Sequence, residues 1–375
     1  MIIAHIITCL NDGGAEAVLY RLCLADQQHS HVVISLQNEG KYGSLLKQAG
    51  VAVHCLNMPR GLLIPGGIWK LTRLLRNIRP DAVQTWMYHA DLLGGLVARA
   101  VGIHRVFWGL HHTNLKKGKT RRTTILVAQL NAWLSHWIPK SIVSCSQEGV
   151  AVHQAIGYAI NKFTVIPNGY DLNQFSPNSK PGNALRSSLG ISDDLPLLGM
   201  VARFDPQKDH LNLIAALELL KQSGFNFRCL LIGSGMTEAN ADLIAWLDAH
   251  SISDRVLLLG QRSDVPAIMT ALTIHVLSSS FGEAFPNVLC EAMACGTPCV
   301  TTDVGDAALI VGETGWVVPP RSAESLAHAI ADAMMQRIAN PKTWEKRQVA
   351  ARQRIQNHFS VESMVECYAN TWLRE

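Results

Sequence analysis

The most suggestive residues of this sequence are two glutamates, Glu283 and Glu291, with seven residues between them. A carboxylate accepts several hydrogen bonds at once, so it can grip paired hydroxyl groups on a sugar or a ribose. Eight residues rise only about 12 Å even when they are fully helical. The two side chains can therefore reach opposite ends of one nucleotide sugar.

The residues around these glutamates predict a strand, a turn and a helix in succession. The strand is expected to end near Ser279, Glu283 lies in a glycine-containing turn, and Pro286-Asn287 opens a helix that stops at Gly296. Backbone N–H groups in a first helical turn are unpaired and carry the positive end of the helix dipole, which suits a phosphate. We therefore expect the amides around Phe285–Leu289 to face an anionic ligand.

Two cations, Arg203 and Lys208, follow a predicted strand at Leu197–Ala202. On one loop, cations five residues apart can converge on a diphosphate, and an arginine can bind it through two parallel hydrogen bonds. Departure of a nucleoside diphosphate builds negative charge on its oxygens, so fixed cations at that place lower the barrier. The pair predicts stabilisation of a leaving diphosphate.

The segment Phe281–Met293 (FGEAFPNVLCEAM) resembles the E-x7-E signature of retaining GT-B glycosyltransferases, the large family often called group 1. The resemblance implies that Glu283 contacts the transferred sugar and that Glu291 holds the ribose of the nucleotide. It also implies that three backbone amides touch the sugar or the diphosphate, those of Phe285, Asn287 and Val288.

Two further segments resemble the same family. Gly199–His210 (GMVARFDPQKDH) matches the loop on which the family carries an arginine and a lysine for the diphosphate, and Pro167–Phe175 (PNGYDLNQF) matches its inter-domain segment. The strand before the glutamates departs from the pattern. Relatives commonly have an aspartate and an aromatic residue where this chain has Thr273 and His275, and we expect the difference to alter packing.

The first half of the chain offers three weaker candidates. Gly13 and Gly14 follow the first predicted strand, where glycines let the backbone approach a ligand, and the GGAE form resembles the glycine loop of the family. His111 and His112 follow the strand Arg105–Leu110, where the family often has a histidine on the donor sugar, and we assign this role to His111. His89, at another strand end, is a candidate on the acceptor side.

A basic segment follows His111 and His112 in the sequence. Its five cations precede an apolar, tryptophan-bearing stretch that ends at Trp137, which is typical of docking to an anionic membrane. A solvated loop before a core helix is an equally good interpretation. Because this part faces the acceptor in the family, the resemblance also implies a lipid-linked acceptor. The cations are Lys116, Lys117, Lys119, Arg121 and Arg122.

The elements that would position these residues form an alternating pattern. Short apolar runs alternate with helical patterns along the whole chain, which predicts parallel sheets with helices on both faces. The alternation breaks once, at a polar stretch that runs to about Pro196. We predict two Rossmann-like domains, residues 1–168 and 169–358, with a final helix at about 359–375 that packs back on the first. Such a GT-B fold binds ligands in the cleft at the carboxyl ends of its strands.

Composition narrows the class of protein. The chain has 375 residues, of which 48% are hydrophobic and 17% charged, so it can bury two cores. A net charge of +4 is too small to favour a nucleic acid partner. Nine scattered cysteines predict a reducing compartment. Met1–Leu10 lacks the features of a signal peptide and is interpreted as a buried strand. We expect a cytoplasmic protein at the inner face of the cell membrane.

We expect no metal and no cofactor. No D-x-D pair occurs, and Arg203 and Lys208 can replace a cation at the diphosphate. The spacing of Cys290, Cys295 and Cys299 matches no standard zinc or iron–sulfur pattern, so we expect core thiols.

The predicted function is transfer of a hexose or N-acetylhexosamine from a nucleoside diphosphate sugar, most simply a UDP-sugar, to a glycan or lipid-linked saccharide in surface polysaccharide or lipopolysaccharide assembly. A nucleotide-sugar epimerase of the same fold is the first alternative. An NAD-dependent oxidoreductase is the second, although Gly13-Gly14 stands where that class has G-x-G-x-x-G.

Overall fold

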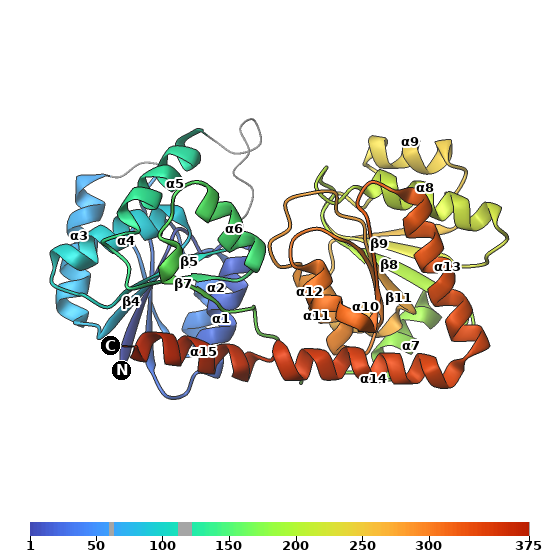
Figure 1. Ribbon diagram of the computed structural model, residues 1–375. Helices are drawn as coiled ribbons and strands as arrows, with labels where there is room; N and C mark the ends of the chain where they lie inside the picture. The colour runs from blue at the N-terminus through green and yellow to red at the C-terminus, as the bar shows by residue number, and fades with distance from the viewer. Residues whose placement is uncertain (60–63, 112–121, 375) are drawn as a thin grey trace. The chain divides into compact units, whose positions relative to one another are not determined.

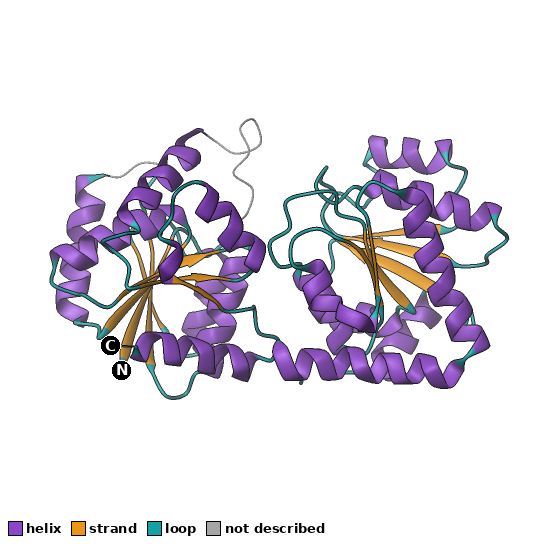
Figure 2. Ribbon diagram, in the orientation of Figure 1, coloured by secondary structure: helices purple, strands orange, loops and turns teal. Residues whose placement is uncertain are grey.

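The computed structural model describes residues 1–59, 64–111 and 122–374. The chain forms two compact units (Figure 1). The first consists of Met1–Gly169 together with Val361–Glu375, and the second of Tyr170–Ser360. The chain therefore passes from one unit to the other twice, after Gly169 and after Ser360. Each unit is a parallel sheet with helices on both faces (Figure 2), as the alternating sequence pattern predicts.

Among the described residues of the first unit, seven parallel strands lie in the order β3-β2-β1-β4-β5-β6-β7. The strands are β1 (Ile2–Ile7), β2 (Ser30–Ser35), β3 (Ala52–Cys55), β4 (Ala82–Trp86), β5 (Val106–Leu110), β6 (Ser141–Ser144) and β7 (Phe163–Val165). The helices are α1 (Gly14–Ala25), α2 (Gly40–Gln48), α3 (Pro65–Ile78), α4 (Tyr88–Ala100), α5 (Arg122–Leu134), α6 (Gln147–Ala155) and α15 (Val361–Leu373). The strand order reverses between β1 and β4, which is where open α/β sheets bind ligands.

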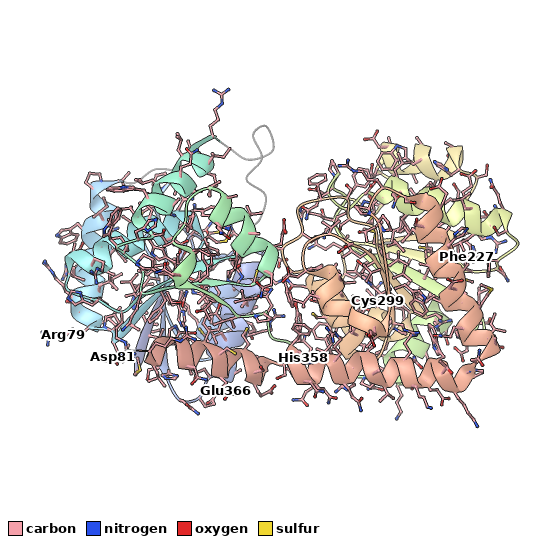
Figure 3. All side chains as sticks on the ribbon, viewed as in Figure 1. Arg79, Asp81, Phe227, Cys299, His358 and Glu366 are labelled. Carbon is pink, nitrogen blue, oxygen red and sulfur yellow. The ribbon has the colours of Figure 1, made fainter. Side chains whose placement is uncertain are left out.

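The first sheet has a separate hydrophobic core on each face. Helices α3, α4 and α5 cover one face, and α1, α2 and α15 cover the other. The C-terminal helix α15 packs against α1 and buries Tyr368 and Trp372 in this second core. Asp81, labelled in Figure 3, lies at the amino end of the sheet. Its carboxylate accepts a hydrogen bond of 2.7 Å from the backbone N–H of Ile2.

The second unit, whose residues 170–360 are all described, has a six-stranded parallel sheet in the order β10-β9-β8-β11-β12-β13. Its strands are β8 (Leu197–Val201), β9 (Arg228–Ile232), β10 (Val256–Gly260), β11 (Ile274–Leu277), β12 (Cys299–Thr302) and β13 (Trp316–Val318). Its helices are α7 (Ser179–Ser188), α8 (His210–Gln222), α9 (Ala241–Ala249), α10 (Val265–Ala271), α11 (Asn287–Ala294), α12 (Ala307–Val311), α13 (Ala323–Ala339) and α14 (Pro341–His358). Here the order reverses between β8 and β11.

The structure corrects the sequence-based map at the polar stretch before Pro196. This stretch is not only a linker, because it contains helix α7, whose first turn is capped by the Asn178 side chain. None of the helices in the described residues is both long and apolar enough to cross a membrane.

Candidate functional site

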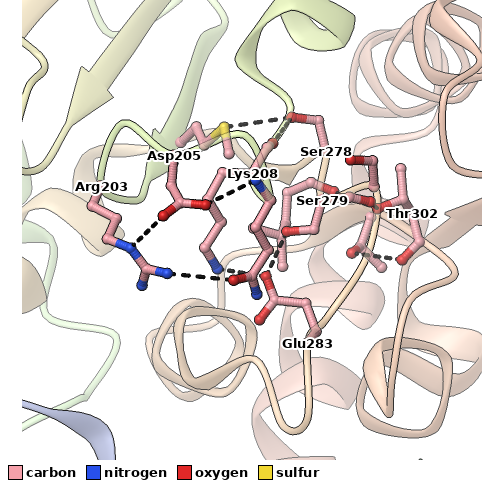
Figure 4. A network of polar contacts seen from close by, with 12 residues as sticks. Arg203, Asp205, Lys208, Ser278, Ser279, Glu283 and Thr302 are labelled. Carbon is pink, nitrogen blue, oxygen red and sulfur yellow. Dashed lines mark hydrogen bonds and ion pairs between the residues drawn. The ribbon is translucent and has the colours of Figure 1, made fainter. Parts of the chain in front are cut away.

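Two loops of the second unit meet at the carboxyl edge of its sheet. Lys208 lies in the loop between β8 and α8, and Glu283 in the loop between β11 and α11. Their side chains form an ion pair, with Nζ 2.5 Å from Oε1, and are only 12% and 8% exposed (Figure 4). A pair this well buried is costly to break, because either charge alone would lack a partner. The structure thus joins the two motifs that carry the sequence prediction.

A serine holds the same carboxylate oxygen. The Ser279 hydroxyl donates to Oε1 of Glu283 at 2.5 Å, so Lys208 and Ser279 share one acceptor atom. The carbonyl oxygen of Ser279 accepts a hydrogen bond of 2.6 Å from the hydroxyl of Thr302, at the end of β12. Two neighbouring strand ends therefore fix the position of Glu283.

Arg203 is exposed at the rim of this site. Its Nε lies 3.2 Å from the Asp205 carboxylate, and a terminal nitrogen donates to the Gln207 amide oxygen at 3.3 Å (Figure 4). The other oxygen of Asp205 accepts the backbone N–H of Gln207 at 2.9 Å, which closes a tight turn. Exposed contacts of this kind add little stability. Their effect is to orient the guanidinium.

Hydrogen bonds also join the two loops along their backbones. The Ser278 hydroxyl donates to the Lys208 carbonyl oxygen at 2.9 Å, and the N–H of Ser280 donates to the Gln207 carbonyl oxygen at 2.9 Å. Asp209 adopts a left-handed backbone conformation, with φ of 50°, and its side chain caps α8. Lys208 is therefore held at a sharp turn between a strand and a helix.

A third loop, after β12, packs against the backbone of Glu283 and Ala284. The N–H of Asp306 donates to the Ala284 carbonyl oxygen at 3.1 Å. Gly305 has a φ of 62°, and a Cβ there would collide with the carbonyl group of Glu283. Only glycine fits both the conformation and the space at this position.

Helix α11 presents its amino end at the same edge of the sheet. Asn287 and Val288 lie in its first turn, where the helix dipole is positive. The Tyr170 hydroxyl donates to the Asn287 side-chain oxygen, and Phe285 is buried against Phe359. Glu291 lies one turn into the helix and is half-buried.

The carboxyl edge of the first sheet has a different chemistry. His111, directly after β5, stacks on Trp86 at the end of β4, with ring centroids 5.1 Å apart and an interplanar angle of 18°. Burial lowers the pKa of His111 to about 4, so the ring is neutral near pH 7. Its Nε2 has no hydrogen-bond partner in the described part of the chain. His89, the second residue of α4, is half-buried, and burial lowers its pKa as well.

The glycine loop lies at the end of β1. Gly13 precedes α1 in an extended conformation, and Gly14 is the first residue of the helix. A Cβ at Gly13 would collide with the Glu16 carboxylate, which folds back over the loop. Burial raises the pKa of Glu16.

Comparisons with known proteins identify the family. The family model "Glycosyl transferases group 1" matches residues 183–354, and "Glycosyltransferase Family 4" matches residues 12–174. The putative glycosyltransferase EpsF of Bacillus subtilis is 34% identical over 320 residues, which cover 80% of this chain and 79% of EpsF. The chain belongs to the group 1 glycosyltransferases.

Other relatives of this glycosyltransferase have more specific names. A UDP-Gal:alpha-D-GlcNAc-diphosphoundecaprenol alpha-1,3-galactosyltransferase of Escherichia coli is 25% identical over 299 residues, which cover 79% of this chain and 76% of the relative. The capsular polysaccharide biosynthesis glycosyltransferase CapM of Staphylococcus aureus is 27% identical and covers 89% of both chains. Among solved structures, Anabaena HepE in complex with UDP matches with a TM-score of 0.85 at 22% identity over 99% of both chains, which shows a common GT-B fold.

Within the glycosyltransferase, the predicted site residues fall into three groups. Lys208 and Glu283 are in direct contact, with Arg203 on the same loop as Lys208. The first unit holds Gly13, Gly14, His89 and His111 at its own strand ends. Lys116, Lys117, Lys119 and Arg121 lie outside the described residues, as does His112, while Arg122 is exposed at the start of α5.

The sequence prediction missed the residues that orient the charged ones. Ser279, Thr302 and Gly305 were given no role, and Asp205 and Gln207 were passed over although they lie within the quoted segment Gly199–His210. The run Ser278–Ser280 was a usable signal, because three hydroxyl groups at the end of a buried strand need acceptors nearby.

The two departures from the family pattern have different consequences. Thr273 accepts hydrogen bonds from the Leu197 N–H and from the buried guanidinium of Arg186, both at 3.0 Å, so it joins two elements of the second unit. His275 is fully buried and neither ring nitrogen has a partner among the described residues. Burial lowers its pKa to about 3.

Cys290, Cys295 and Cys299 are buried and form no disulfide bonds. Burial raises the pKa of Cys295 to about 12, and it raises that of Cys299 still further. Both side chains are therefore neutral thiols in a hydrophobic core, as expected from the sequence.

Proposed function

We propose that this glycosyltransferase is a retaining, metal-independent enzyme that uses a UDP-sugar as its donor. The observation that carries the proposal is the buried Lys208–Glu283 pair, with Arg203 held on the same loop. A fixed cation next to a fixed carboxylate suits a donor whose diphosphate lies beside the sugar it releases. The existence of HepE structures with UDP and with UDP-glucose supports UDP as the nucleotide.

Each predicted site residue of the second unit then has a defined role. Arg203 and Lys208 neutralise the leaving diphosphate in place of a metal ion, together with the amides of Phe285, Asn287 and Val288. Glu291 binds the ribose. Because both Lys208 and Ser279 bind Oε1 of Glu283, the other carboxylate oxygen is available to orient a hydroxyl of the transferred hexose or N-acetylhexosamine.

In a retaining transfer, the acceptor attacks from the face that the diphosphate leaves. The bond from the anomeric carbon to the phosphate oxygen breaks, and a bond from that carbon to the acceptor oxygen forms. The departing phosphate takes the proton of the acceptor hydroxyl, so no side chain has to act as a base. His111, Gly13 and Gly14 are the donor contacts that we propose for the first unit.

We propose a glycan or lipid-linked saccharide as the acceptor, in surface polysaccharide or lipopolysaccharide assembly at the inner face of the cell membrane. The names of the E. coli and S. aureus relatives support this acceptor class. His89 is its candidate contact. Exposed apolar side chains support a membrane surface as the location. Leu126, Leu130 and Trp133 follow one stripe of α5, and Trp137 comes just after the end of the helix.

Thermal unfolding with UDP, GDP, ADP, NAD and the matching nucleotide sugars tests the donor assignment. A ligand at about 100 times its Kd stabilises the protein by about 2.7 kcal/mol, which is a readable shift. Stabilisation by UDP and UDP-sugars, lost in Glu291→Ala and in Arg203→Ala, is the expected result. Stabilisation by NAD alone, or by none of these compounds, would contradict the proposal.

A further inference from the structure

A row of polar side chains lies in the core of the first unit. The indole N–H of Trp86 donates to Nδ1 of His5 at 3.2 Å, and Nε2 of His5 lies 2.9 Å from Nδ1 of His31. The other ring nitrogen of His31 lies 3.3 Å from the Asp26 carboxylate. The row therefore runs from the carboxyl end of β4 to the residue that follows α1.

Trp86 determines where the protons of this row lie, because an indole N–H can only donate. Nδ1 of His5 accepts from Trp86, so a neutral His5 carries its proton on Nε2 and donates it to His31. Neutral His31 then carries its proton on the nitrogen that faces Asp26. Burial lowers the pKa of both histidines, which keeps both rings neutral near pH 7. This set of protons satisfies the contacts from Trp86 to His5 and from His5 to His31. Nε2 of His31 lies close to the Asp26 carboxylate but makes no hydrogen bond with the described residues.

A metal ion is a weaker explanation of the same histidines. His5, His31 and Cys23 are the one group of metal-type ligands in the described residues whose atoms lie within 4.8 Å of one another. Tetrahedral zinc holds nitrogens at about 2.0–2.1 Å, which places two of them about 3.3 Å apart. The observed 2.9 Å fits a hydrogen bond. Burial also raises the pKa of Cys23, and a protonated thiol is a poor ligand.

The row ends at the aromatic ring on which His111 stacks. Trp86 is fully buried and lies against the ring of Tyr368, at 5.9 Å and 28°, as well as against His111. A hydrogen bond from its edge therefore fixes the plane of an indole that already has an aromatic neighbour from α15. The imidazole of His111 is nearly parallel to that plane, so its orientation depends on the indole.

The backbone next to Trp86 is strained. Met87 has a φ of 74° and a ψ of 154°, a backbone conformation that residues other than glycine rarely adopt. Its N–H donates to the Gly109 carbonyl oxygen at 2.8 Å, which ties the end of β4 to the end of β5. Trp86 and His111 are therefore brought together by backbone and by side chain alike.

We propose that Trp86 is a positioning residue for His111, and that the row through His5 and His31 fixes the plane of its indole. This inference rests on the proposed function for its catalytic consequence, because there His111 contacts the donor sugar. In this proposal, buried residues of the first unit contribute to the reaction indirectly, by orienting His111.

The variant Trp86→Phe tests the proposal, because it keeps an aromatic surface and removes the N–H. We expect kcat for sugar transfer to fall about tenfold, as displaced reacting groups cost enzymes that much or more, with the affinity for UDP alone unchanged. Trp108→Phe is the matched control. Trp108 is equally buried, in β5, and its indole N–H makes no hydrogen bond with the described residues.

Two readouts separate positioning from general damage. In a His111→Ala background, Trp86→Phe should have no further effect on kcat, whereas an additive loss would overturn the proposal. Histidine NMR should show the pKa of His111 rising from about 4 in Trp86→Phe and unchanged in Trp108→Phe. Because this titration needs no substrate, an unmoved His111 would refute the positioning role even if the donor assignment fails.

Discussion

The carboxyl edges of the two sheets differ in the charge they present. In the second unit, that edge holds Lys208 and Glu283, which pair across two loops, and Arg203, which is oriented by residues of its own loop. In the first unit, it holds His111, neutral and stacked on a buried tryptophan, and the half-buried His89. Both edges are preorganised, one by charge pairing and the other by aromatic packing.

Under the proposed function, the two edges recognise chemically different groups. A leaving diphosphate is an anion and needs cations that are already in place, whereas a sugar is a neutral molecule that is recognised by directed hydrogen bonds. A neutral imidazole can give such a bond without attracting the diphosphate to the wrong side. Substitutions in one unit should therefore have effects that substitutions in the other unit do not reproduce.

Breaking the charge pair should have the largest effect. Lys208→Met should lower kcat by about 10²–10³, because a cation at the developing charge is lost, and should destabilise the second unit by about 3 kcal/mol, because Glu283 is left unpaired. Adding Glu283→Gln should restore stability without restoring activity. Lys221→Met, which removes a surface partner of Asp254, is the control. Equal activity of Lys208→Met and wild type would show that the charged edge is not the diphosphate site.

Replacing the arginine should have a smaller effect. Arg203→Lys keeps the charge and loses the planar group that Asp205 and Gln207 orient, so we expect about a tenfold rise in the Kd for UDP. Isothermal titration calorimetry measures it. Arg337→Lys, which alters an arginine bound to the carbonyl groups of Asp193 and Asp194, should leave the Kd unchanged. An identical loss in both variants would remove the special role of Arg203.

Lowering the pH should destabilise both units, because each contains buried neutral histidines. The folded pKa is about 4 for His111 and His210 and about 3 for His275, below the ordinary value of 6.5. The unfolded chain therefore binds more protons as the pH falls below about 6.5, and each site costs up to about 1.4 kcal/mol per pH unit until its folded pKa is reached. Urea unfolding at pH 7 and pH 5 should show the loss, and His275→Leu should reduce it in the second unit. A pH dependence unchanged in that variant would contradict the assignment.

Removing an exposed tryptophan should affect membrane binding by the first unit alone. Trp133 is 62% exposed on α5, and Trp133→Ser should weaken binding to phosphatidylglycerol-containing vesicles by about tenfold, as expected for one interfacial aromatic residue. Co-sedimentation measures this. Ile338→Ser, which removes an apolar side chain that is 71% exposed in the second unit, should have no effect. Equal losses would indicate nonspecific adsorption.

The sequence predicted the charged residues better than the residues that hold them. Charges at strand ends, such as Lys208 and Glu283, are rare and have a direct chemical meaning, and the parallel alternation placed both on the same edge. Their contact across 75 residues depends on strand order, which periodicity does not encode. The row from Trp86 to Asp26 was missed for a related reason. His5 and His31 look like ordinary strand residues until β1 and β2 are paired.

Helix α15 has a consequence for how the protein is made. Its tryptophan, Trp372, packs in the first unit beside His5 and His31 and donates to the buried Gln84 side chain, yet it follows the whole second unit in the sequence. During synthesis, the first 169 residues leave the ribosome long before the helix that completes their core. Synthesis of the first unit therefore starts before that of the second unit and is completed after it. A nascent chain stalled before Val361 would expose this half-built surface to chaperones and proteases.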